Sequence, residues 1–341
     1  MSARLVQVTR SPPSHWDRIL SESDAGHLFH TADWAEYRAT TASLAPLYFV
    51  VGRSASMPRS ATAALGLEVP LLGARLRPMA WRLAFDSSPI PAQGRTAFMQ
   101  ALRQWAHHRP GLVSIECGSL DGDWGSDFGG PPLRRLEFVV DVSGGHSLER
   151  MRKSTRYEVR RAARAGVKIS AVHSRDDVEA VVKLHRATLA DLMRRKHVSG
   201  ARPPFDAMAS AIERLIARKA ADAFLARRNG APIGACIFGY AGTTAYYLLS
   251  GSSALGREYA AIHLIISTAL DEFGGRRFEH VNLGGVPVDS TVNDHPDHGL
   301  YLFKRGFGGE VVTRVGGTVV LRPRQLRAVR LARQSLKRRG G

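Results

Sequence analysis

Asn282-Leu-Gly-Gly285, followed after a polar loop by Gly299-Leu-Tyr-Leu-Phe-Lys-Arg-Gly-Phe-Gly308, is the most informative stretch of this chain. Its aromatic and apolar run predicts a short strand over 301–304, and the glycines that follow predict a turn. Lys304 stands between aromatic neighbours at the end of that strand. A lysine so placed can face a substrate cleft, although position alone favours a solvated lysine at a strand end beside core aromatic residues.

Helix and strand patterns occur in the same order twice along the chain. In the first half, apolar-periodic helices around Trp16 and Trp34 come before strands and one longer helix. The predicted strands are 47–51, 63–72, 79–85, 112–117 and 136–142, and the longer helix is 95–107.

The second half repeats this order more clearly. Asn229-Gly230 predicts a type I′ hairpin between two of its strands, because both residues tolerate positive φ. The predicted helices are 147–165, 175–195, 205–220 and 259–273, and the predicted strands are 223–228, 233–240, 244–250, 278–283, 301–304 and 311–321.

Helices, an antiparallel meander, a long helix and another strand follow one another in the order of a GNAT-type acyltransferase domain, here doubled. We therefore predict an α/β (α+β) fold of two tandem GNAT-like domains, with mixed, mostly antiparallel sheets flanked by helices. Ser143-Gly-Gly145 is the predicted junction, which gives domains 1–145 and 146–321 and a basic C-terminal helix or tail, 322–341. The segment 205–220 is one short helix, so we expect no coiled-coil arm.

The net charge is the unusual feature of the composition. The 341 residues include 48 Lys and Arg against 30 Asp and Glu, a net charge of +18, and the pI is near 10.8. Such a balance favours polyanionic partners such as RNA, nucleotides or anionic lipid surfaces. With 44% hydrophobic residues the chain can also bury a full core.

Cysteine usage and hydropathy indicate the compartment. Cys117 and Cys236 are too few for a disulfide framework or a thiolate metal site. No stretch approaches the roughly 20 apolar residues of a membrane span, and Met1–Arg10 lacks the regions of a signal peptide. We therefore expect a cytoplasmic protein.

Four segments together resemble the Fem-type aminoacyltransferases of the GNAT superfamily, which use aminoacyl-tRNA to form a peptide bond on an amine. The resemblance is carried by the opening stretch, by Phe29–Arg38 with its Trp-containing helix, by the basic helix Ser154–Val167, and by Arg202-Pro-Pro-Phe205. It runs nearly end to end in the family's order. It is less specific for the acceptor, which is a peptidoglycan precursor in most of the family and a small-molecule amine in natural-product relatives.

The resemblance implies roles for the residues around the Phe-Lys pair. Lys304 would stabilise the charge that develops on the ester carbonyl, as an oxyanion-hole donor does. Phe303 or Tyr301 would stack on the terminal adenosine of the tRNA. Strand alternation points Phe303 and Lys304 to opposite faces, so we expect a twist or bulge near Arg305-Gly306 if both contact one ligand. Aminoacyl-tRNA is the co-substrate, and no cofactor is expected.

Arg38 and Arg202 match, by resemblance, two basic positions that bind the diphosphate of a nucleotide-linked acceptor. Such a pair would make a two-point anion clamp, with Pro203 fixing the local backbone; the alternative is two solvated arginines. The turn Ser87–Pro91 lacks the carboxylate that members acting on cell-wall precursors often carry, and Asp86 is the nearest. The acceptor contacts, and the general base if there is one, therefore stay open.

Two basic elements account for part of the charge. In the helix from Ser147, four arginines recur every four residues and form one stripe, Arg152, Arg156, Arg160 and Arg164. A stripe of this kind fits a phosphate backbone, with electrostatic rather than base-specific contacts. The segment 322–339 has eight basic residues and no acidic one; it can bind tRNA, lie peripherally on an anionic membrane, or be a solubilising tail.

The connection 287–298 combines acidic and imidazole groups, Asp289, Asp294, His295, Asp297 and His298. These residue types can bind a metal or act as an acid–base pair. They lack helical spacing, however, and are common in turns. We predict a loop beside the cleft, whose carboxylates can recognise a free ammonium group, and no metal site.

Two other functions stay open. An acyl-CoA-dependent GNAT N-acyltransferase binds pyrophosphate through a Gln/Arg-x-x-Gly-x-Gly/Ala loop at a helix start, and Gly251–Ala260 lacks that spacing. A non-catalytic RNA-binding protein would explain the charge but not the Lys304 segment. The sequence does not identify the amino acid, the acceptor or the oligomeric state.

Overall fold

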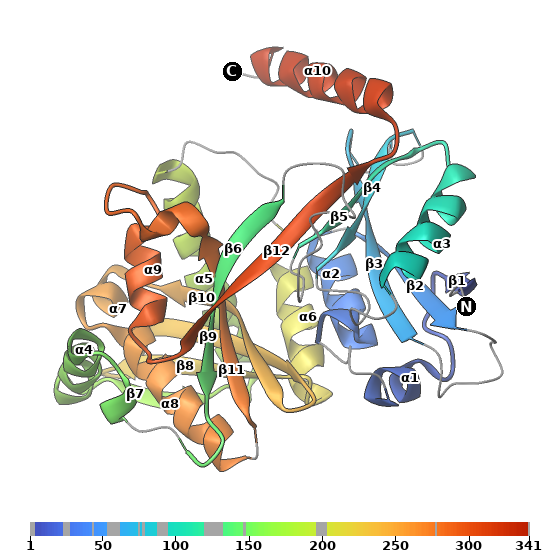
Figure 1. The fold of residues 1–341 in the computed structure, drawn as a ribbon. Helices are drawn as coiled ribbons and strands as arrows, with labels where there is room; N and C mark the ends of the chain where they lie inside the picture. Colours follow the sequence, from blue (N-terminus) through green and yellow to red (C-terminus); the bar gives the residue numbers. More distant parts are fainter. Residues whose placement is uncertain are drawn as a thin grey trace. The chain divides into compact units, whose positions relative to one another are not determined.

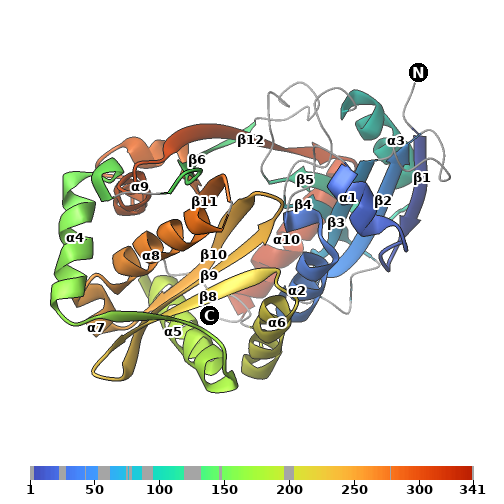
Figure 2. The ribbon, with the colours of Figure 1, turned by 90° about the horizontal axis from the view of Figure 1, so that it is seen from below.

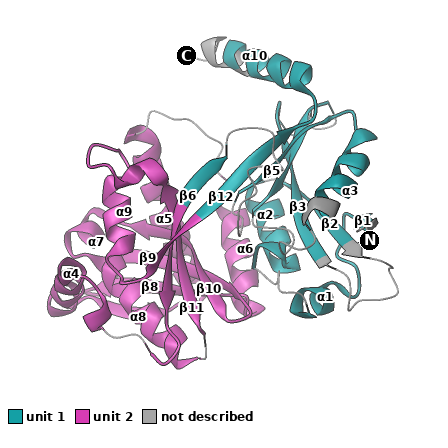
Figure 3. Ribbon diagram, in the orientation of Figure 1, with its two compact units in different colours: residues 1–135, 314–341 teal, residues 136–313 magenta. Residues whose placement is uncertain are grey.

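The computed structural model divides the chain into two compact units (Figure 3). Unit 1 is Met1–Arg135 together with Arg314–Gly341, and unit 2 is Leu136–Thr313. The residues that the structure describes are 4–22, 28–42, 44–52, 62–73, 76, 79–86, 95–118, 132–145, 148–195, 203–276 and 278–339.

Unit 1 contains a six-stranded sheet with the strand order β1-β2-β3-β4-β5-β12. The pairs from β1 to β4 and the β5–β12 pair are antiparallel, and β4 and β5 are parallel. Its elements (Figure 1) are β1 Arg4–Thr9, α1 Trp16–Glu22, η1 Leu28–His30, α2 Ala32–Ala42, β2 Ala45–Gly52, β3 Thr62–Pro70, β4 Trp81–Phe85, α3 Arg95–His107, β5 Leu112–Cys117, most of β12 (Glu310–Val320) and α10 Pro323–Arg339.

The helix α3 covers the core of unit 1. Its Phe98, Met99, Leu102 and Ala106 recur at helical spacing and pack with strand residues such as Phe49 and Ile115. The helix has the bounds that the sequence predicts.

The basic C-terminal segment is a helix of unit 1. Val329 of α10 is buried against Leu71, Ala80 and Val113, and Leu326 packs against the same cluster. The amide groups of Leu321 and Arg322 also donate to the Val113 carbonyl oxygen at 2.9 and 3.2 Å. These contacts explain why 314–341 belongs with unit 1, whereas the sequence predicted a separate tail from 322.

Unit 2 contains a sheet with the strand order β6-β11-β10-β9-β8-β7, in which β7 to β10 are antiparallel and β10 and β11 are parallel. Its elements are β6 Leu133–Asp141, η6 Leu148–Arg150, α4 Lys153–Arg164, β7 Lys168–Ala171, α5 Arg175–Arg195, α6 Phe205–Ala217, β8 Ala221–Arg228, β9 Ala231–Ala241, β10 Thr244–Ser252, α7 Ala254–Glu258, α8 Ala261–Gly275, β11 His280–Pro287, η7 Val288–Thr291 and α9 His298–Arg305.

Helices cover both faces of this sheet. Alternate residues such as Phe224 and Phe238 pack against Phe273 of α8, while α5 contacts β9 and β10 from the other face (Figure 2). The predicted hairpin joins β8 and β9, with φ of 49° at Asn229 and 80° at Gly230. The mixed, mostly antiparallel sheets flanked by helices agree with the predicted fold class, and α6 is one 13-residue helix.

The unit boundary differs from the predicted junction at 145/146. Leu136, Phe138, Val140 and Val142 are all part of the core of unit 2. Most of the strand β6 therefore belongs to unit 2, and the division falls at 135/136.

The predicted strand over 301–304 is wrong, because this segment lies in α9. No β-branched residue occurs between His298 and Gly308, and Leu, Phe, Lys and Arg are all compatible with a helix. The chain leaves the helix at Gly306, whose amide donates to the Leu302 oxygen at 3.0 Å. Successive side chains are about 100° apart in a helix, so the bulge expected near Arg305 is not needed.

Candidate active site

The parallel strands of unit 2 separate part of the way along. β10 pairs with β11 from Thr244↔His280 to Tyr246↔Asn282, yet the strands continue to Ser252 and Pro287. β10 shifts its register against β9 just after Tyr247, and Gly284 of β11 has φ of +73°. Bulges of this kind are frequent beside active sites, because they redirect backbone groups out of the ladder.

Lys304 lies at this opening. Its Nζ donates to the Gly285 carbonyl oxygen at 3.4 Å and is 3.3 Å from the point where a Cβ on Gly284 would lie. The Tyr247 carbonyl oxygen is 3.9 Å from that same point. Lys304 is only 7% exposed, and it lies in the last turn of α9, where the helix dipole favours a cation. A buried ammonium therefore lies where β10 and β11 part.

The rings of Phe303 and Tyr301 make more contacts with neighbouring side chains than the sequence indicates. The Phe303 ring packs edge-on against His263 of α8, with centroids 4.8 Å apart, and against Phe307 at 5.3 Å. Tyr301 contacts Phe138 at 5.8 Å, and the Arg305 guanidinium lies 5.7 Å from its ring. Both rings remain half-exposed, so each presents part of its surface to solvent.

His263 adds an imidazole beside Phe303 that sequence reasoning missed. Burial lowers the pKa of His263, the nearby Glu158 opposes this shift, and Arg161 adds to it. The ring is partly buried, and with a lowered pKa it is neutral at neutral pH. No local motif marked this residue, because its importance depends on the packing of α8 against α9.

The arginine stripe lies on α4. The start of this helix contacts the end of α9, the helix that carries Lys304. The Arg152 amide donates to the Gly306 carbonyl oxygen at 2.9 Å. A Cβ on Gly306 would lie 2.0 Å from Thr155 Oγ1, so only glycine permits this close packing. The start of α4 and the end of α9 are therefore fixed to each other.

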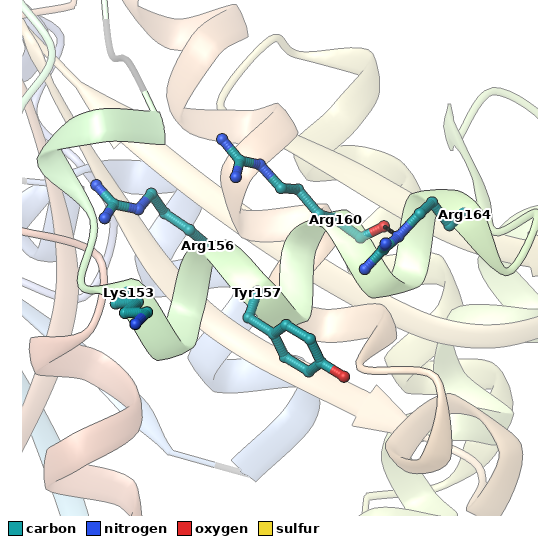
Figure 4. Close-up of a pocket in the computed structure, with 5 residues that line it drawn as sticks. All are labelled: Lys153, Arg156, Tyr157, Arg160 and Arg164. Atoms are coloured by element: carbon teal, nitrogen blue, oxygen red, sulfur yellow. Dashed lines mark hydrogen bonds between the residues drawn. The ribbon is translucent and has the colours of Figure 1, made fainter.

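Three of the four predicted arginines line one groove of about 430 Å³ (Figure 4). Arg156, Arg160 and Arg164 share it with Lys153 and Tyr157, from successive turns of α4. Arg152 is the exposed N-cap residue of the helix and is not among the groove-lining residues. Tyr157 is 57% exposed. Sequence reasoning missed Lys153 and Tyr157, although their helical spacing to Arg160 and Arg164 placed them on one face.

Among the described residues, no acidic side chain forms an ion pair with the four cations of this groove. Glu158 of α4 pairs instead with Arg161, whose guanidinium also donates to the backbone carbonyl oxygen of Glu258 at 2.7 Å. Arg156 donates to the Glu149 carbonyl oxygen at 3.1 Å, which orients the guanidinium and leaves its charge uncompensated. Four cations and one exposed ring in a groove suit a flexible polyanion that carries aromatic bases.

Arg38 in unit 1 is already paired. Its guanidinium donates to Asp86 at 2.7 Å, and the same carboxyl oxygen accepts from Trp34 Nε1 at 2.9 Å. Any anion bound by Arg38 would therefore share it with Asp86. Arg202, the second predicted clamp residue, lies outside the described residues.

The segment after β10 uses its amide groups within the protein. Ser252 donates to Thr188 Oγ1 at 2.8 Å, Ser253 to the Ile233 oxygen at 3.0 Å, and Gly256 to Ser253 Oγ at 3.0 Å. These three amides are directed at protein oxygens and away from any pyrophosphate. The geometry of the segment therefore gives no support to the CoA alternative.

The connection between β11 and α9 is a 3-10 turn, η7, and a series of tight turns. His298 Nδ1 lies 2.9 Å from the Ser290 oxygen, and the Asp297 amide donates to His295 Nδ1 at 3.0 Å. Among the described residues, no group of three or more His, Cys, Asp or Glu side chains is arranged to hold a metal ion. No helix in the described part of the chain is long and apolar enough to cross a membrane.

Comparison with known proteins supports the resemblance seen in the sequence. The FemAB family model matches residues 208–332, a range that includes the opening at β10 and β11 and the helix α9. No curated protein sequence matches the chain significantly.

Solved structures share the fold at low identity. FemX is 13% identical with a TM-score of 0.66 and covers 91% of this chain and 97% of its own. L-PGS from Bacillus licheniformis is 13% identical with a TM-score of 0.56, covering 96% and 98%. A tandem GNAT protein from the clavulanic acid biosynthesis pathway is 14% identical with a TM-score of 0.50, covering 93% and 99%. The predicted tandem GNAT-like fold is thereby confirmed.

Proposed function

We propose that this chain, an acyltransferase whose residues 208–332 match the FemAB family, moves an aminoacyl group from aminoacyl-tRNA to the amine of an acceptor. The observation that carries the proposal is the contact between the start of α4 and the end of α9. Through this contact, the helix with the groove of uncompensated cations packs against the helix with the buried ammonium at the opening of the sheet. A polyanionic donor with a reactive ester at its end matches both features.

The reaction forms one bond and breaks one. The acceptor amine attacks the ester carbonyl carbon, and the carbonyl oxygen becomes an oxyanion beside the Lys304 ammonium. The intermediate then collapses and expels the ribose hydroxyl oxygen of the terminal adenosine, while the amine loses a proton that reaches this oxygen through water. An amide and a deacylated tRNA result. The buried ammonium stabilises the oxyanion more strongly than it would in water.

The α4 groove would bind the tRNA near its acylated end. Arg156 and Arg164 are eight residues apart, which corresponds to about 12 Å along a helix. Phosphates of the strand would lie along this face, and the exposed Tyr157 ring would stack on an unpaired base, a contact worth about 1–3 kcal/mol. The exposed parts of Phe303 and Tyr301 would contact the terminal adenosine. Arg152, at the start of the helix, would meet the phosphate closest to Lys304.

The acceptor is the less defined substrate. We propose a peptidoglycan precursor or a small-molecule amine, bound near Arg38 and Arg202 if it carries an anionic group. The basic helix α10 would give a peripheral contact with an anionic membrane if the acceptor is membrane-bound. The reaction uses aminoacyl-tRNA as its co-substrate and needs no cofactor, and we expect it in the cytoplasm, where charged tRNA is found.

The proposal is tested by asking which acyl donor the protein uses, aminoacyl-tRNA or acetyl-CoA. The protein is incubated with candidate amines and either radiolabelled aminoacyl-tRNA or radiolabelled acetyl-CoA, with and without RNase. We expect transfer from aminoacyl-tRNA that RNase abolishes. Transfer from acetyl-CoA that is insensitive to RNase would favour the CoA-dependent alternative, and tRNA binding without any transfer would favour the RNA-binding alternative.

A further inference from the structure

Two buried polar side chains lie directly behind the opening that holds Lys304. Glu137 of β6 is 6% exposed and Asn282 of β11 is 7% exposed. Their neighbours Leu136, Phe138 and Leu283 are in the apolar core, so strand alternation places both polar side chains on the opposite face of the sheet. Buried polar side chains in such a position need a specific reason, because an apolar pair would be easier to bury.

Hydrogen bonds connect this pair to the lysine. Asn282 Nδ2 donates to Glu137 Oε2 at 2.9 Å, and Asn282 Oδ1 accepts from the Gly284 amide at 2.7 Å. Gly284 adopts a φ of +73°, and the next carbonyl, that of Gly285, accepts from Lys304 Nζ. These contacts therefore link the Glu137 carboxyl group to the Lys304 ammonium through the Asn282 amide and the glycine turn.

The order of donors and acceptors fixes the Asn282 amide in one orientation. A carboxylate oxygen accepts hydrogen bonds only, so the NH₂ group must face Glu137. The amide oxygen then accepts from the Gly284 N–H. If Glu137 were apolar, the Asn282 NH₂ group would be buried without this acceptor, which is unfavourable. The amide would no longer be held in the orientation that presents its oxygen to Gly284, and the turn would be less firmly fixed.

We propose that Glu137 and Asn282 are positioning residues, which hold the Gly284-Gly285 turn so that its carbonyl group orients the Lys304 ammonium. The inference rests on the proposed function for its catalytic consequence. The geometric part, that the pair controls where the ammonium lies, is independent of the reaction.

Chemical labelling of Lys304 tests the geometric part without an activity assay. The folded protein is treated briefly with acetic anhydride, and acetylation of each lysine is measured by peptide mass spectrometry. In the wild type Lys304 should react slowly because it is buried, while Lys183, with a 68% exposed side chain, reacts fast. In Glu137→Leu and Asn282→Leu we expect Lys304 to react at least fivefold faster, with Lys183 unchanged. Glu137→Gln, which keeps an acceptor for the Asn282 amide, should recover most of the protection.

The matched control is Glu68→Leu. Glu68 is 5% exposed in unit 1 and accepts from Arg10 at 2.9 Å. The substitution therefore also removes a buried carboxyl group, but one in the other unit from Lys304. It should lower the stability of the protein without changing the labelling of Lys304. Unchanged Lys304 labelling in folded Glu137→Leu would overturn the proposal. If Glu137→Leu does not fold, Asn282→Ser, which removes the bridging amide without adding apolar bulk, gives the same test with the same deciding outcome.

Kinetics test the catalytic part. Glu137→Leu should lower kcat about tenfold with the KM for aminoacyl-tRNA within twofold, and Glu137→Gln should recover most of the loss. In a Lys304→Ala background, Glu137→Leu should cause no further loss, because both act through one ammonium. Additive losses would contradict the proposal. If no transfer from aminoacyl-tRNA is found, the proposed function fails while the labelling result still decides the role of Glu137.

Discussion

Strands β1 to β5 of unit 1 and β7 to β11 of unit 2 lie in the same order in their sheets, and the two units differ in the extent of their parallel pair. In unit 1 the pairing of β4 with β5 runs from Trp81↔Leu112 to Phe85↔Cys117, with one register shift after Trp81, and extends to the ends of both strands. The Gly118 amide then adds a bond to the Phe85 oxygen at 2.8 Å. In unit 2 the corresponding pair of β10 and β11 ends at Tyr246↔Asn282.

This difference explains why we place the chemistry in unit 2. The β4–β5 pairing extends to the ends of both strands, whereas the β10–β11 pairing stops early and makes carbonyl groups such as that of Gly285 available to orient a side chain. The cations differ in the same way. Arg38 of unit 1 is neutralised by Asp86, while the groove on α4 keeps its charge. We therefore propose the reactive site in unit 2, where the parallel pairing stops early and the cations of the groove stay uncompensated.

The largest expected effect is that of Lys304→Ala. Removing one donor to an oxyanion typically lowers kcat by about 10²–10³, and we expect a loss of at least about tenfold, or 1.4 kcal/mol. The unfolding temperature should stay within a few degrees, because the buried cation also costs desolvation. Steady-state kinetics with aminoacyl-tRNA provide the measurement. Lys183→Ala, on the exposed side of α5, is the matched control, and a near-normal rate for Lys304→Ala would remove the distinction between the units.

Charge reversal of the α4 groove should have the next largest effect. In Arg156→Glu with Arg160→Glu, two phosphate contacts are lost, and each contributes about 0.7–0.9 to the slope of log affinity against log salt concentration. We expect weaker tRNA binding and a slope flatter by nearly two, measured by filter binding between 50 and 200 mM salt as a rough range. The control is Arg194→Glu on α5, where Asp191 already pairs with the arginine. Unchanged salt dependence in the double variant would mean that the groove binds no tRNA.

The sequence anticipated most elements but not the local geometry of the site. Helices 95–107 and 175–195 have the predicted bounds because their apolar spacing is regular and long. The segment around Lys304 failed because four apolar residues in succession carry no period that separates strand from helix. Lys304 itself was identified through a family resemblance. Its partners could not be, because Glu137 and Asn282 are 145 residues apart and meet only in the folded sheet.

A smaller effect should separate two glycines, Gly284 and Gly118, that follow the last parallel pair of each unit. At Gly284 an added Cβ meets Lys304 Nζ at 3.3 Å, and φ is +73°; at Gly118 it meets only ordinary contacts from 3.5 Å. We expect Gly284→Ala to cost about 1–2 kcal/mol of unfolding free energy, because alanine is strained at positive φ, and to lower kcat several-fold. Gly118→Ala should change both quantities little. Denaturant unfolding and kinetics of the two variants provide the comparison, and equal losses would show that the opening in unit 2 is not specially constrained.

The smallest expected effect is a pH dependence confined to unit 2. Burial lowers the pKa of His263, so between that lowered pKa and about 6.5, the usual value, the unfolded chain binds a proton that the folded chain does not. The stabilising contribution of the neutral imidazole is therefore present above about pH 6.5 and is lost as the pH falls below it. Hydrogen exchange at pH 7.5 and pH 5.5 should show faster opening of α8 at the lower pH, with α3 of unit 1 changing less. His263→Gln, which cannot titrate, should remove the difference between the helices even if it lowers stability at both pH values. Equal acid sensitivity of α3 and α8 in the wild type would instead assign the pH dependence to groups other than His263, whose ring packs against Phe303 and Phe307 of unit 2.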